Sequence, residues 1–103
     1  MYYPIPLKLR AWLENNNIPH EVDDHKGYIT IMLEEGCTWI NKLGEPMKYD
    51  RTVSIHKEYG GWQVYITTGY MAGYYIGKGL TIAGVIRIVE AIMEDEKDGT
   101  EEV

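Results

Sequence analysis

The feature that most constrains how this chain can fold is a pair of adjacent glycines, Gly60-Gly61, flanked by alternating apolar and polar residues. Two glycines can both adopt the positive φ angles that a tight hairpin turn requires. Reading outward from this pair predicts an antiparallel hairpin with Ile55 opposite Ile66 and His56 opposite Tyr65. The apolar face of the hairpin comprises Val53, Ile55, Trp62, Val64 and Ile66, and its polar face comprises Ser54, His56, Glu58, Gln63, Tyr65 and Thr67.

Two segments carry apolar residues at helical spacing, and they lie near the two ends of the chain. The first is predicted over residues 6–16, where Ile5, Leu9 and Leu13 fall on one face. The second begins after a capping threonine, Thr81, and runs to about Glu94. Its apolar stripe consists of Ile82, Val85, Ile86, Val89, Ile92 and Met93. A stripe this wide predicts a helix that packs firmly against a sheet.

The rest of the chain favours strands separated by turns. Strands are predicted at 20–23 and 28–34, with a break at Glu35-Gly36 and a short strand at 37–40. The Gly/Tyr-rich segment 69–79 is interpreted as a loop before the last helix. The predicted fold class is therefore α+β: an antiparallel meander sheet of four to five strands, with the N-terminal and C-terminal helices packed on one face. The buried set is expected to include Val53, Ile55, Val64, Ile66, Ile82, Val85, Ile86 and Val89.

Charge divides the chain into a nearly neutral body and an acidic end. The formal net charge is −6, and seven of the 16 acidic residues lie from Val85 onward. We expect residues 1–97 to form a single compact domain and residues 98–103 to be an acidic, disordered tail. A basic stripe, which nucleic-acid-binding proteins normally carry, is not visible in the sequence. Direct binding to nucleic acid is therefore not expected.

Cysteine content and hydropathy indicate a compartment. The single cysteine, Cys37, cannot form an internal disulfide and fits a reducing environment. The first residues have neither the basic region nor the apolar region of a signal peptide. No apolar run approaches the ~20 residues that a membrane-spanning helix needs. We therefore expect a cytoplasmic protein that does not associate with membranes.

Three patterns in the sequence could carry chemistry, and each lacks something that the chemistry requires. His20 and His25 flank three carboxylates, but five residues of extended chain hold the two rings about 15 Å apart, too far for one metal ion. Lys78-Gly79 before a helix departs from the phosphate-loop motif, which has Ser or Thr after the lysine. His56 and Glu58 share a face but have no nucleophile beside them. The sequence thus predicts no catalytic residue, no metal, no cofactor and no enzyme.

The aromatic composition points to binding. The chain has nine tyrosines, three tryptophans and no phenylalanine, so every aromatic ring except histidine combines apolar area with a hydrogen-bonding group. We expect the uncovered sheet face to contact a partner through Tyr28, Thr30, His56, Glu58, Tyr65 and Thr67. The predicted function is a small acidic, stand-alone regulator or inhibitor that binds another protein, with a basic surface on that partner. Accessory proteins of viruses and other mobile elements are often of this kind, and self-association stays open.

The alternative is a binder of a small ligand or nucleotide. In this interpretation the Gly/Tyr-rich segment before the last helix forms the site, because N–H groups at a helix N-terminus attract anions. The residues involved would be Tyr70, Tyr74, Tyr75, Lys78, Gly79 and Thr81. The sequence does not decide between the sheet face and this segment.

Overall fold

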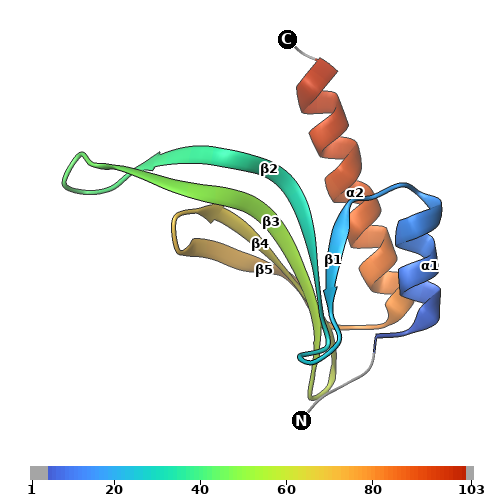
Figure 1. Ribbon diagram of the computed structural model, residues 1–103. Helices are drawn as coiled ribbons and strands as arrows, with labels where there is room; N and C mark the ends of the chain where they lie inside the picture. Colours follow the sequence, from blue (N-terminus) through green and yellow to red (C-terminus); the bar gives the residue numbers. More distant parts are fainter. Residues whose placement is uncertain (1–4, 102–103) are drawn as a thin grey trace.

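The computed structural model describes the backbone of residues 5–101 and the side chains of residues 5–97. Its elements are α1 (Leu7–Asn15), β1 (His20–Asp23), β2 (Tyr28–Ile40), β3 (Pro46–Glu58), β4 (Gly61–Gly69), β5 (Ala72–Leu80) and α2 (Ile82–Glu101). Within this range the strands form one antiparallel meander in the order β1-β2-β3-β4-β5. Both helices lie on the same side of the sheet, and the far halves of β2 and β3 bend away from them (Figure 1). The predicted α+β fold is confirmed.

The hydrophobic core lies between the helices and one face of the sheet. It consists of Ile5, Leu9, Leu13, Ile18, Ile29, Ile31, Val53, Ile55, Trp62, Val64, Val85 and Val89. Three residues predicted to be buried, Ile66, Ile82 and Ile86, are only half-buried and pack at the margin of this cluster. Ile66 is less covered than predicted because it lines a groove between β5 and α2. We call the opposite side of the sheet the open face.

The Gly60-Gly61 hairpin is present, but its register differs from the prediction by two residues. Ile55 pairs with Val64, and His56 pairs with Gln63 rather than Tyr65. The turn residues are Tyr59 and Gly60, since Glu58 pairs with Gly61. Side chains alternate between the two faces with a period of two, so a two-residue shift leaves every side chain on its predicted face.

The predicted break at Glu35-Gly36 is wrong, because β2 continues through it. The pairing with β3 shifts register between Met32 and Glu34 and again between Glu34 and Cys37. Such bulges absorb extra residues without ending a strand. Gly36 adopts a φ of 69° and donates its N–H to the Asp50 side chain at 3.0 Å, which holds the irregular stretch in place.

The Gly/Tyr-rich segment is also not a loop, since most of it forms β5. Its glycines mark close packing. A Cβ on Gly73 would collide with the Ile66 carbonyl oxygen, and one on Gly77 would lie 2.8 Å from Ile88 Cδ1. Tyrosine and isoleucine in turn favour strands. The glycine content that suggested a loop therefore reflects the space that β4 and α2 leave for β5.

Helix α2 starts as predicted and ends later. The Thr81 hydroxyl accepts the Gly84 N–H at 3.1 Å, which is the hydrogen bond of an N-cap. The helix then runs to Glu101 instead of ending near Glu94. Of the predicted acidic tail, residues 98–101 continue the helix backbone, and residues 102–103 lie outside the described residues. Neither of the described helices is long and apolar enough to span a membrane.

Candidate functional site

Four aromatic side chains from four adjacent strands meet on the open face. Tyr28 pairs with His56 across β2 and β3, and Tyr65 pairs with Tyr75 across β4 and β5. The Tyr28 and His56 rings stack with centroids 4.8 Å apart, and the Tyr65 and Tyr75 rings meet edge to face at 5.1 Å. The ring centroids of His56 and Tyr75 lie 6.2 Å apart, and this contact connects the two pairs. These spacings are those of favourable aromatic contacts, and we call the group the tyrosine–histidine cluster.

His56 is buried although it lies on the face that the helices leave uncovered. It is 6% exposed, because the tyrosines cover its ring. Its Nε2 lies 3.5 Å from Glu58 Oε1, but its Nδ1 has no hydrogen-bond partner among the described residues. A buried polar atom without a partner costs about 1–3 kcal/mol. The sheet therefore maintains this arrangement at some cost to its own stability.

The remaining residues predicted for the contact face have mostly structural roles. Thr30 is half-buried opposite Ser54 in the β2–β3 pairing. The Thr67 hydroxyl shares a hydrogen bond of 3.1 Å with the Thr52 hydroxyl across β3 and β4. Tyr28, His56 and Tyr65 are brought together as the alternation implied. Tyr75, which the sequence assigned to the alternative ligand segment, completes their cluster.

The six residues predicted for a small-ligand site do not gather at one place. Tyr75 lies on the open face, whereas Tyr74 lines the groove beside α2. Lys78 places its Nζ 4.6 Å from the centroid of the Tyr75 ring. Tyr70 lies at the β4–β5 turn, and the Thr81 hydroxyl caps α2. One of the N–H groups in the first turn of α2, that of Gly84, is thus already satisfied.

Negative charge borders the cluster beside Tyr28. A shallow cleft of about 540 Å³ is lined by Glu21, Val22, Asp23, Asp24, Lys26, Tyr28 and Thr30. Asp23 uses Oδ1 to accept the N–H groups of His25 and Lys26, both at 3.0 Å, so this carboxylate is partly occupied by the turn. A further carboxylate, that of Glu58, lies beside His56 of the cluster. The cleft lining thus has three carboxylates and one lysine, and one of the carboxylates, Asp24, also pairs with Arg10 at 3.4 Å.

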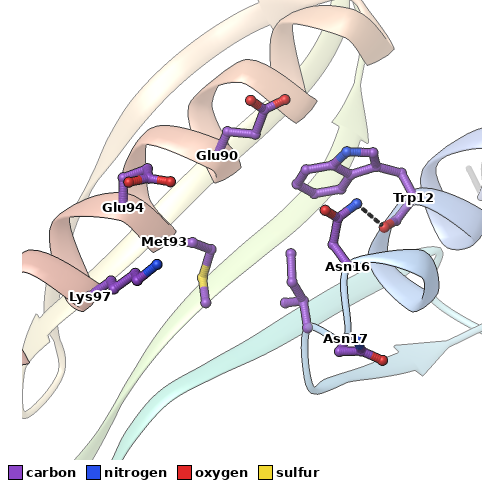
Figure 2. A pocket seen from close by; sticks show the side chains of 8 residues that line it. Trp12, Asn16, Asn17, Glu90, Met93, Glu94 and Lys97 are labelled. Carbon is purple, nitrogen blue, oxygen red and sulfur yellow. Dashed lines mark hydrogen bonds between the residues drawn. The ribbon is translucent and has the colours of Figure 1, made fainter.

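A pocket that the sequence did not indicate lies between the two helices (Figure 2). Its volume is about 520 Å³, and it is lined by Trp12, Asn16, Asn17, Ile18, Glu90, Met93, Glu94 and Lys97. Figure 2 shows the Trp12 ring extending from α1 toward α2, with Met93 opposite. The Asn16 side chain donates to the Trp12 carbonyl at 2.8 Å. The charged residues of its lining are two carboxylates, Glu90 and Glu94, and one lysine, Lys97.

Cys37 is half-buried on β2, and its environment makes it a weak nucleophile. Burial raises the pKa of the Cys37 thiol, and the nearby Glu34 carboxylate raises it further. A raised pKa lowers the thiolate fraction near neutral pH, and the thiolate is the reactive form. We therefore expect iodoacetamide to alkylate the native protein more slowly at pH 7.5 than the urea-unfolded chain, with the rate rising at higher pH. Equal rates for the two states would contradict this assignment.

Comparison of the chain with protein-family models, with curated proteins and with solved structures finds no match.

Proposed function

We propose that this chain is a non-catalytic binding protein whose open face holds a partner protein that presents basic side chains. The observation that carries the proposal is the tyrosine–histidine cluster, a set of aromatic rings assembled around a buried histidine on an uncovered surface. Packed rings lose little conformational entropy on binding, and Tyr is enriched among the residues that dominate binding energy. Tyr28 and Tyr75 remain 40% and 42% exposed, so a partner can reach both.

Charge supports a basic partner. The chain has a net charge of −6, and the cleft beside Tyr28 contributes Glu21, Asp23 and Asp24 to the edge of the open face. Negative potential of this kind accelerates association with a positively charged surface and does so less at high salt. A cytoplasmic stand-alone regulator or inhibitor that acts by occupying such a surface fits these features.

The proposal is tested by photo-crosslinking from the open face. Benzoylphenylalanine is placed at position 28 or 75 and, as a control, at position 59, because Tyr59 is 98% exposed at the β3–β4 turn, outside the cluster. In lysate of the source organism, positions 28 and 75 should crosslink to the same protein, and position 59 should not. A different protein at each position, or equal labelling from position 59, would exclude the open face as the contact.

The captured partner then allows a measurement of affinity. The Tyr28→Ala/Tyr75→Ala variant should bind it about 10- to 100-fold more weakly, the effect expected for hot-spot side chains. Tyr59→Ala should bind like the unmodified protein. Thermal unfolding of each variant establishes that the domain remains folded, so that a loss of affinity reports on the contact.

A further inference from the structure

The two edges of the sheet are built differently. The β1 edge has only four residues, follows Pro19 and carries Glu21 and Asp23. Short edge strands, proline and charged side chains are the usual devices that prevent a sheet edge from pairing with another chain. At the other edge, β5 has nine residues, and residues 69–77 contain no charge and no proline. The β5 edge lacks these devices along that run, and its own charged residue, Lys78, lies beyond the register shift at Ile76.

The β5 edge offers backbone groups for pairing. Within the described part of the chain, β5 has a paired strand on one side only, β4. From Gly73 to Tyr75 the register with β4 is regular, and the first irregularity beyond it is at Ile76, between the Tyr65–Tyr75 and Val64–Gly77 pairs. A regular strand with a free side presents a row of N–H and C=O groups to a further strand. Residues 72–76, with a regular centre at 73–75 between two register shifts, are thus available as a template.

An apolar groove runs beside this edge, between β5 and α2. Its volume is about 440 Å³, and its lining is Arg51, Ile66, Tyr74, Ile76, Ile88, Ala91, Ile92, Asp95 and Glu96. Tyr74 is 59% exposed and Ile76 is 37% exposed, although both line the groove together with Ile88, Ala91 and Ile92 of α2. Side chains from an added strand would cover these two residues and enter the groove. The free edge and the groove therefore form one continuous surface.

The charge at this groove favours a basic occupant. Arg51 donates two hydrogen bonds to Glu96, one of them from Nη1 to Oε2 at 3.1 Å, and a third to Glu34 at 3.3 Å. The hydrogen bond to Glu96 raises the pKa of Arg51. The guanidinium is therefore charged while it binds the carboxylates of Glu96 and Glu34. With Asp95 in the lining, three carboxylates at and next to the groove face one cation. A second copy of the chain would bring the same acidic rim and a further net charge of −6.

We propose that β5 accepts an extended segment of a partner protein as a sixth strand of the sheet. Backbone hydrogen bonds to residues 72–76 hold the segment, its alternate apolar side chains enter the groove between β5 and α2, and a lysine or arginine lies near Asp95. Strand addition of this kind draws affinity from main-chain hydrogen bonds and specificity from pockets for alternate side chains. This surface is separate from the tyrosine–histidine cluster, since Tyr74 and Tyr75 point to opposite sides of the sheet.

The probe is a phage-displayed library of random dodecapeptides, selected on the immobilised full-length chain. Enriched peptides should alternate apolar residues and carry at least one lysine or arginine. Their affinity should fall about ten-fold or more in Tyr74→Asp, and about three-fold or more in Asp95→Asn, since hot-spot truncations and lost charge pairs have effects of this order. Tyr59→Asp is the matched control, because it places the same charge on an exposed tyrosine away from the edge.

Hydrogen exchange of the unmodified protein provides a second readout that does not depend on the variants folding. Added peptide should slow the hydrogen exchange of amides within residues 72–76. Sedimentation should show that each complex with peptide contains one copy of the chain. The proposal is overturned if no peptide is enriched, if the enriched peptides lack basic residues, or if Tyr74→Asp binds them as Tyr59→Asp does. Exchange rates at residues 72–76 that do not change on addition of peptide would equally overturn the proposal. So would a dimer of the chain formed through β5.

Discussion

Replacing Ile55 by alanine should lower the free energy of unfolding by about 2–5 kcal/mol, which would be among the largest effects of any single truncation in this chain. Ile55 is 0% exposed and lies in the middle of the sheet, paired with Ile29 on β2 and Val64 on β4. Its removal leaves a cavity in the core between the sheet and the helices, which the hydrogen-bonded strands cannot close by moving together. Urea denaturation of the purified protein measures the change.

The control for this substitution is Ile40→Ala. Ile40 is the same residue type, also lies in a strand, and is 58% exposed at the end of β2. Exposed truncations usually change stability by about 0.5 kcal/mol or less. If the two variants lost the same stability, the core would not lie where the structure places it.

Gly61→Ala should destabilise the protein by about 3 kcal/mol, because two unfavourable terms add. Gly61 has a φ of 139°, which an alanine rarely adopts, and such strain costs about 1–3 kcal/mol. A Cβ at this position would also lie 2.7 Å from the carbonyl carbon of Gly79 and 2.9 Å from the Leu80 nitrogen. Both are backbone atoms of β5, which cannot yield as a flexible side chain would, and overpacking costs about 1–3 kcal/mol more.

Gly44→Ala separates the two terms. Gly44 has a φ of 81°, and a Cβ there would meet nothing within 4 Å. This variant therefore carries the backbone strain alone, and thermal unfolding should show a clearly smaller loss of stability than for Gly61→Ala. Equal losses would mean that the contact between the start of β4 and the end of β5 adds nothing to the cost.

The pattern of side chains along the chain was sufficient to predict the fold class. Alternation around Gly60-Gly61 assigned every hairpin side chain to its correct face, although the register was two residues off, because a shift of two preserves the alternation. Helical spacing likewise identified Leu9, Leu13, Val85 and Val89 as core residues. These properties are local, since a side chain's face depends only on its position within its own element.

Only the tertiary structure decided which elements pack against one another. The surfaces proposed for binding depend on these contacts between elements. Tyr75 belongs to the tyrosine–histidine cluster because the Gly/Tyr-rich segment pairs with β4. The sequence did not predict this long-range pairing, because the glycines of the segment are typical of a loop. The pocket between Trp12 and Met93 exists because two helices from opposite ends of the chain share one sheet face. Sequence periodicity therefore determined which residues face the core. Packing between distant segments determined which polar and aromatic side chains lie next to one another. The physical reason is that such packing depends on shape and volume, which no local pattern records.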